Sequence, residues 1–224
     1  MKFVYKALLL ASLIFSSTVH AETKPASEHE KFSYAIGVQF AQTVARQDVQ
    51  LDVDSFLQAM RDVITGAPLK LNMEEMQNAM NSYREKEMAR QNSLGEKNRE
   101  EGEKFLAENK NKEGVISVPG GLQYKVLKEG TGKKPLADST VLVHYRGTLL
   151  NGKEFDSSYG RGEPLEIDLN RVIKGWQIAL PMMPTGSKWK LFIPSPLGYG
   201  PSAAGPDIGP NSTLIFEIEL LSVK

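Results

Sequence analysis

The sequence predicts an α+β protein in two parts: an all-helical domain over residues 22–113, then an antiparallel sheet domain wrapped on a short helix over residues 114–224. Apolar residues recur every three or four positions up to about residue 113, as on one face of a helix, and several later segments alternate with period two, as in strands. The Asn151-Gly152 pair between apolar residues adds a strong signal for a hairpin of antiparallel strands.

The first 21 residues have the pattern of a secretory signal peptide. Lys2 and Lys6 give a basic start, an apolar run follows over residues 7–15, and residues 19–21 (VHA) end the segment with the small-x-small pattern of a cleavage site. The apolar run is too short for a membrane-spanning helix, which needs about 20 residues. An N-terminal anchor is the alternative. We expect cleavage after Ala21 and export of the chain.

The composition argues against several classes of function. The chain has no cysteine, so neither disulfides nor a lipid-modified cysteine can form. Without Lys2 and Lys6, the 27 basic residues fall to 25 against 27 acidic residues, a net charge of −2, and nothing indicates the basic face of a nucleic-acid-binding protein. Of the three histidines, His20 lies in the predicted signal peptide, which leaves no metal-ligand spacing. We expect no metal, no cofactor and no nucleic acid.

The first two helices are delimited by capping residues. One begins at the capping box formed by Ser27 and Glu30, and apolar residues follow it at a spacing of four. The next begins near Asp52 or Asp54, carries its apolar residues on one face and ends at Gly66.

The third helix is predicted to run from Asn72, where Glu75 completes the cap, to about Asn111. At 1.5 Å per residue, roughly 40 residues extend about 60 Å. Its second half is highly charged, so we expect a linking helix stabilised by ion pairs between residues four apart. Gly95 and Gly102 each cost about 1 kcal/mol relative to alanine in a helix and are candidate positions for a bend.

Methionines form an apolar seam at the start of this helix. Met73, Met76, Met80 and Tyr83 are spaced by three, four and three residues, which suits packing against another helix. Two interpretations are open: the seam packs inside a small helical bundle, or it packs against a second copy of the chain. The second makes the protein a homodimer through residues 22–90.

The second domain contains five predicted strands and one predicted short helix. The helix is expected around residues 175–183, after a turn-rich junction at residues 115–121. The strands are expected at residues 122–127, 140–150, 165–169, 188–193 and 213–223.

Nucleophilic catalysis is not predicted. Ser157 and Ser158 follow Asp156, but alternation along the strand turns His144 away from the face that carries Tyr145. A Ser-His-Asp arrangement would therefore lack its base.

What remains is a set of aromatic side chains and one pair of opposite charges, Asp156 and Arg161. Aromatic residues in a small sheet domain are usually core, but several of these stand beside glycines or loops, where ligand contact is favoured. A core and an apolar pocket are both open interpretations. The aromatic residues are Tyr145, Phe155, Trp176, Tyr199 and Phe216.

The motifs of the second domain resemble those of the FKBP-type peptidyl-prolyl cis-trans isomerases. They occur in order and at family spacing over about half the chain. The helical half, with YAIG at residues 34–37, is similar to the dimerisation region of the exported bacterial macrophage-infectivity-potentiator and FkpA-like subgroup. The motifs are GLQY (121–124), VHYRGT (143–148), GKEFDSS (152–158), VIKGW (172–176), LGYG (197–200) and PNSTLIF (210–216).

The resemblance implies an FKBP-type fold, a five- or six-stranded antiparallel sheet wrapped on a short helix with a pocket between them. Trp176 would form the pocket floor, and the walls would be Tyr145, Phe155 and Phe216. The backbone N–H of Ile173 would bind a substrate carbonyl.

The resemblance also implies polar roles at the pocket edge. Asp156 would accept a hydrogen bond from Tyr145, and Tyr199 would donate one to the substrate. Leu165 replaces an aromatic residue common in the family, which should widen the pocket, and Gly209 loosens the flap loop. The remaining implied substrate- and inhibitor-binding residues are Arg161, Leu165, Val172 and Ile208.

The implied activity is rotation about X-Pro bonds. Amide resonance sets a barrier of about 18–20 kcal/mol, and a dry aromatic pocket can favour the less polar, twisted transition state without a nucleophile or metal. The implied partners are proline-containing peptides, unfolded exported proteins and the macrolides tacrolimus and rapamycin. The implied location is the periplasm, with outer-membrane or surface association as a further possibility. The alternative function is a dimeric holdase or adhesion module with an incidental pocket.

Overall fold

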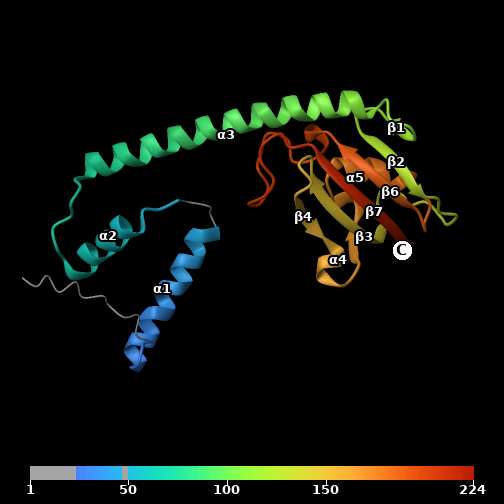
Figure 1. Cartoon of the computed structure of the whole chain (residues 1–224). Coiled ribbons are helices and arrows are strands. Elements are labelled where there is room, and N and C mark those ends of the chain that lie inside the picture. The colour runs from blue at the N-terminus through green and yellow to red at the C-terminus, as the bar shows by residue number, and fades with distance from the viewer. Residues whose placement is uncertain (1–23, 47–49) are drawn as a thin grey trace, which may run out of the picture. The chain divides into compact units, whose positions relative to one another are not determined.

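The structure, a computed structural model, describes residues 24–46 and 50–224 (Figure 1). The signal peptide predicted over residues 1–21 lies outside the described residues. The chain divides between Gln50 and Leu51 into two compact units. None of the helices formed by the described residues is long and apolar enough to cross a membrane.

The first unit contains helix α1 (Glu28–Arg46). Its predicted capping box is confirmed: the Glu30 N–H donates to Ser27 Oγ at 3.1 Å, and the Ser27 N–H donates to the Glu30 carboxylate at 3.0 Å. The helix buries no residue, and its apolar side chains, such as Phe32 and Ile36, are exposed.

The second unit begins with helix α2 (Val53–Thr65). Asp52 caps its N-terminus by accepting a hydrogen bond from the Ser55 N–H, and Gly66 ends it in the left-handed conformation with φ of 69°. Of the two starts predicted for this helix, the structure selects Asp52, and the predicted end at Gly66 is confirmed.

Helix α3 (Met73–Asn109) is continuous over 37 residues. Asn72 and Glu75 form the predicted capping box, and ion pairs three or four residues apart, such as Glu96–Arg99 and Arg99–Glu103, lie on its exposed side. The helix continues without interruption through Gly95 and Gly102, the two positions that the sequence offered for a bend.

The sheet has seven strands, all paired antiparallel, where the resemblance implied five or six. Its order is β1-β2-β6-β7-β3-β4, and β5 also pairs with β3. The predicted strands correspond to β2 (Gln123–Lys128), β3 (Thr140–Leu149), β5 (Leu165–Asp168), β6 (Lys188–Ile193) and β7 (Leu214–Val223). Strands β1 (Val115–Ser117) and β4 (Glu154–Ser157), which contain three and four residues, were not predicted from the sequence.

Short helices join the strands and complete the core. Helix α4 (Ser158–Arg161) follows β4, and α5 (Lys174–Ala179) continues into a 3-10 turn at Leu180–Met182, which together match the predicted helix. Helix α5 lies against β6, because a Cβ added to Gly175 would come within 2.6 Å of the Ile193 side chain.

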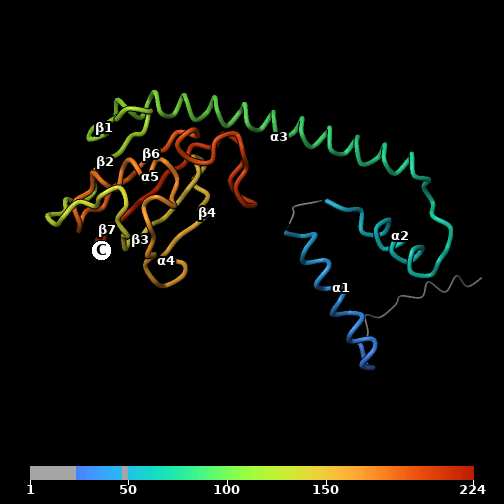
Figure 2. The backbone as a smooth tube through the Cα atoms, turned by 180° about the vertical axis from the view of Figure 1, so that it is seen from behind, coloured from blue at the N-terminus to red at the C-terminus, as the bar shows by residue number. Residues whose placement is uncertain are grey.

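The last turns of α3 pack on the sheet, as Figure 2 shows where the helix ends beside β1, β2 and β6. The Phe105 ring lies 5.8 Å from that of Phe192, and Asn109 Nδ2 donates to Gln123 Oε1 at 3.0 Å. The second half of this charged helix therefore has a tertiary partner.

Candidate active site

A cavity of about 500 Å³ opens between the sheet, α5 and the segment after β6. Strand β3 provides Tyr145, β4 provides Phe155 and Asp156, and β7 provides Phe216. Its other lining residues are Leu165, Ile167, Arg171, Val172, Ile173, Trp176, Tyr199, Ala204, Gly205 and Ile208.

Aromatic rings hold each other edge to face in this cavity. The Trp176 ring meets Tyr145 at 5.2 Å and 79°, and Phe216 at 5.2 Å and 83°. Phe155 meets Phe216 at 5.5 Å and 85°. Each edge-to-face contact stabilises the fold by about 0.5–1.5 kcal/mol in addition to the burial of apolar surface. The apolar walls are therefore in place before a ligand binds.

Trp176 is buried with 4% exposure, and its indole Nε1 has no hydrogen-bond partner among the described residues. A buried N–H without a partner costs free energy that a bound acceptor can recover. Its position at the start of α5, directly after Gly175, is possible because the glycine lets the helix approach β6.

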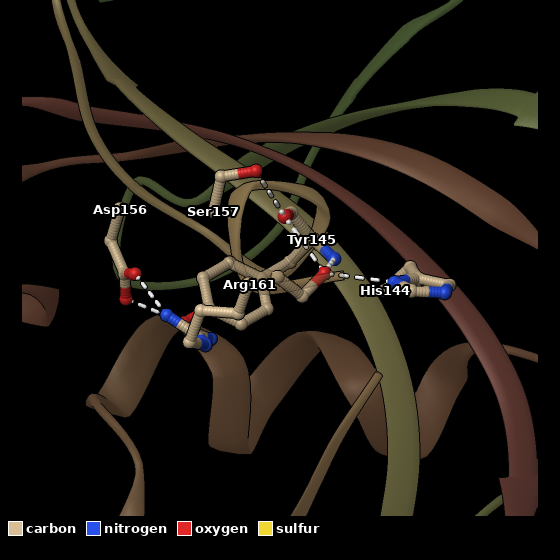
Figure 3. Close-up of polar contacts among 6 residues, drawn as sticks. His144, Tyr145, Asp156, Ser157 and Arg161 are labelled. Atoms are coloured by element: carbon tan, nitrogen blue, oxygen red, sulfur yellow. Dashed lines mark hydrogen bonds and ion pairs between the residues drawn. The ribbon is translucent and has the colours of Figure 1, made fainter. Parts of the chain in front are cut away.

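The polar edge of the cavity is a closed triangle of hydrogen bonds, drawn in Figure 3. The Tyr145 hydroxyl donates to Asp156 at 2.5 Å, and Arg161 donates to Asp156 at 2.6 Å and to the Tyr145 oxygen at 2.7 Å. The Arg161 guanidinium also lies 5.4 Å from the centre of the Tyr145 ring. Each side chain in this triangle therefore orients the other two.

The triangle also sets ionisation at the cavity edge. Burial raises the pKa of Asp156, but hydrogen bonds from Tyr145 and Arg161 outweigh it, so the net pKa lies below the usual value. Burial and then the hydrogen bond to Asp156 raise the pKa of Tyr145, and burial raises that of Tyr199 together with the Asp156 charge. At neutral pH the site therefore holds one carboxylate and two neutral phenols.

The lowered pKa of Asp156 predicts how the triangle depends on pH. A carboxyl whose folded pKa lies below its unfolded value adds stability above the unfolded value and loses it as the pH falls through the folded pKa. We expect Asp156→Asn to lower the urea midpoint at pH 7, and the difference from the parent to disappear as the pH falls below the ordinary value of 3.8. Urea unfolding from pH 7 to acid pH measures this. A difference that grows towards acid pH would contradict the assignment.

His144 and Ser158 form a pair that is not predicted from the sequence. His144 does point away from the Tyr145 side chain, but its Nδ1 lies 2.9 Å from Ser158 Oγ (Figure 3). Ser158 is fully buried, and its hydroxyl also binds the backbone N–H of Tyr145 at 2.8 Å. The sequence predicted that a Ser-His-Asp arrangement would lack its base; His144 does contact Ser158, but this buried serine joins β3 to α4 and cannot meet a substrate.

The structure brings the residues singled out from the sequence to one cavity, with Arg161 beside it through its bonds to Asp156 and Tyr145. Ile173 caps the N-terminus of α5 at the rim, and Tyr199 is 42% exposed at the mouth. No group of three His, Asp or Glu side chains suited to a metal occurs in the described part of the chain.

Sequence reasoning missed four lining residues: Ile167, Arg171, Ala204 and Gly205. Ile167 could have been found, because it lies two residues after Leu165 and so on the same face of β5. Ala204 and Gly205 lie in a loop, where no periodicity indicates direction.

Comparison with known proteins agrees with the fold. Residues 29–126 match the family described as the domain amino-terminal to FKBP-type peptidyl-prolyl isomerase, and residues 131–221 match FKBP-type peptidyl-prolyl cis-trans isomerase. The chain is 38% identical to the outer membrane protein MIP of Legionella longbeachae, over 100% of this chain and 98% of that protein. It is 42% identical to the FKBP-type peptidyl-prolyl cis-trans isomerase FkpA of Aeromonas hydrophila, over 91% of this chain and 79% of that protein.

A solved structure shows the same architecture. The crystal structure of FkpA from Escherichia coli matches with a TM-score of 0.63 and 33% identity, covering 88% of this chain and 97% of that chain. Full-length similarity, both matched domains and the aromatic cavity lead to one conclusion: the chain belongs to the FKBP-type peptidyl-prolyl cis-trans isomerases, among the bacterial Mip and FkpA proteins.

Proposed function

We propose that this isomerase rotates X-Pro bonds inside the cavity floored by Trp176 and that its natural substrates are unfolded exported proteins. The main support for this proposal is the group of aromatic rings that pack edge to face in the cavity, those of Tyr145, Phe155, Trp176 and Phe216. A proline ring is apolar and of a size to pack on such rings. Because rotation breaks no covalent bond, the site needs shape and low polarity more than a reactive group.

The proposed mechanism is preferential binding of the twisted amide. Rotation removes C–N resonance, so the twisted bond is less polar than the planar one, and exclusion of water by the aromatic walls favours it. The Ile173 N–H would hold a substrate carbonyl, and the neutral Tyr199 hydroxyl would donate a hydrogen bond from the mouth. Each 1.36 kcal/mol of preference for the twisted form gives tenfold in rate.

The proposed cellular location is the periplasm, and association with the outer membrane or the cell surface is the alternative. Support comes from the secretory pattern of residues 1–21 and from the printed name of the relative from Legionella longbeachae, an outer membrane protein. Inhibition by tacrolimus or rapamycin is proposed as a property of the same cavity.

A homodimer through residues 22–90 is proposed from the apolar side chains that the single chain leaves uncovered. Met73 is 77% exposed, Met80 62% and Met88 59%, and apolar residues of α2 such as Ile64 are also exposed. Large contiguous apolar surface usually marks an interaction site. Sedimentation of the mature chain should give a dimer, and a monomer would contradict the proposal.

An X-Pro peptide assay with rapamycin tests the cavity. We expect isomerisation by the mature chain and its loss on addition of rapamycin. Retained activity with bound rapamycin would place catalysis elsewhere. The holdase alternative predicts instead that suppression of aggregation survives when rapamycin fills the cavity, so the two functions separate in one preparation.

A further inference from the structure

The flap, residues 204–208, covers one side of the cavity. Ala204 and Ile208 pair as a short antiparallel bridge, and the Ala204 N–H donates to the Ile208 oxygen at 2.8 Å. Ala204, Gly205 and Ile208 line the cavity, and Ile208 is only 6% exposed. The position of the flap therefore helps to set the shape of the pocket.

The flap stem, residues 209–213, lies against α3 rather than in solvent. A Cβ on Gly209 would come within 3.2 Å of the Leu94 side chain, and one on Gly95 within 3.2 Å of Pro210. One on Gly102 would come within 2.2 Å of Thr213 Oγ1. Gly95 and Gly102, seven residues apart, thus let the backbone of α3 contact the stem. This contact explains why two glycines occur in a segment whose other residues favour a helix.

Asn98 ties the stem to this face of the helix. Its Nδ2 donates to the Pro210 carbonyl at 2.8 Å and lies 3.4 Å from Ser212 Oγ. Asn98 is partly buried, so water competes less for these contacts than it would on an open surface.

Asn211 joins three segments at once. Its Nδ2 donates to the Gly95 carbonyl of α3 at 3.3 Å, and its Oδ1 accepts from Ser195 Oγ at 3.4 Å. Its backbone N–H donates to the Gly200 carbonyl at 2.8 Å, directly after Tyr199. Among the described residues that are not glycine, only Asn211 has a positive φ, 55°, a conformation that asparagine tolerates better than most residues.

An ion pair also holds the flap itself. Lys153, in the turn between β3 and β4, lies 2.6 Å from the Asp207 carboxylate. The flap is thus attached to the sheet on one side and, through its stem, to α3 on the other.

We propose that the second half of α3 supports the active site from outside the cavity, with Asn98 and Asn211 as positioning residues that hold Ile208 and Tyr199 at the pocket mouth. Neither asparagine lines the cavity, so each acts through the residue it holds. This inference rests on the proposed cavity for isomerisation. It gives α3 a role in substrate binding that is separate from linking the domains.

Asn98→Ala in the mature chain is the first test. Without the donor, the stem and Ile208 sample more conformations, and the binding-competent fraction falls. We expect KM for an X-Pro peptide to rise about fivefold with kcat nearly unchanged, the size of effect typical for loss of one hydrogen bond. Amide hydrogen exchange at Ile208 should become faster. Glu100→Ala, an exposed position two residues further along the same helix, should change neither quantity.

Asn211 variants separate its side chain from its backbone. Asn211→Gly keeps the positive φ and removes both side-chain links, whereas Asn211→Asp keeps the acceptor for Ser195 and removes the donor to Gly95. Both Asn211 variants should raise KM for the X-Pro peptide. They keep the inference testable if Asn98→Ala fails to fold. Unchanged KM in folded Asn98→Ala and Asn211→Gly would overturn the inference, as would lowered kcat at constant KM. A parent chain without X-Pro activity would instead refute the proposed function.

Discussion

Trp176→Ala is expected to lower kcat/KM for an X-Pro peptide by about 100-fold, which corresponds to about 2.7 kcal/mol of transition-state stabilisation. The indole is the common contact of Tyr145 and Phe216, with ring centres 5.2 Å away in both cases. Its removal lets water into the floor and takes away the surface on which the proline ring would pack. Exchange of the peptide between cis and trans isomers, measured by NMR or a protease-coupled assay, gives the rate.

The chain offers a matched control in Trp189. It is also 4% exposed, its Nε1 also lacks a partner among the described residues, and it stacks on Tyr124 at 4.2 Å without lining the cavity. Loss of either indole should cost several kcal/mol of stability, of the order of 3–5 kcal/mol for a buried Trp→Ala change. If Trp189→Ala reduces kcat/KM as much as Trp176→Ala, the loss reflects unfolding and not the pocket floor.

The sequence predicted the helices well because their ends carry local chemical signals. The caps at Ser27, Asp52 and Asn72 satisfy backbone N–H groups within three residues, so the interaction is visible in the sequence itself. The long strands were predictable for a similar reason, since β3 alternates buried and less buried residues over most of its length. Strands β1 and β4 were not, because three or four residues are too few to establish a period.

The glycines of α3 show where local reasoning fails. Propensity alone makes Gly95 and Gly102 weak points. In the folded chain they are contact points, because Pro210 and Thr213 occupy the space that a side chain would take. Their spacing of seven, with Asn109 seven residues further on, marks one helix face, but the sequence does not say what covers that face.

The site was predictable to the extent that its residues lie in recognisable motifs. The aromatic positions and Asp156 lie in these motifs, and the resemblance to the family implied their roles together with that of Arg161. The contact between His144 and Ser158 depends on how α4 turns after β4, which no residue pattern of a four-residue helix specifies. The support of the flap by α3 joins residues more than 110 positions apart, as in the 112-residue separation of Asn98 and Pro210.

Gly147→Ala is expected to displace two aromatic rings of the cavity wall, those of Phe155 and Phe216. Gly147 lies in β3, and an added Cβ would come within 2.6 Å of Phe155 Cζ and 2.8 Å of Phe216 Cε1. Both rings line the cavity and meet each other edge to face, so neither can yield without moving a wall. Overpacking of this kind costs about 1–3 kcal/mol, and we expect the free energy of unfolding to fall by about 2 kcal/mol.

The same substitution should reduce kcat/KM at least tenfold, since a displaced ring changes the surface that binds the twisted amide. Urea unfolding and peptide kinetics on one preparation measure both effects. Gly160→Ala is the control, because a Cβ there meets nothing within 4 Å and alanine suits a helical position. If Gly147→Ala loses stability but keeps its kinetics, Phe155 and Phe216 serve the core alone, and the binding surface for proline must be sought between Trp176 and the flap.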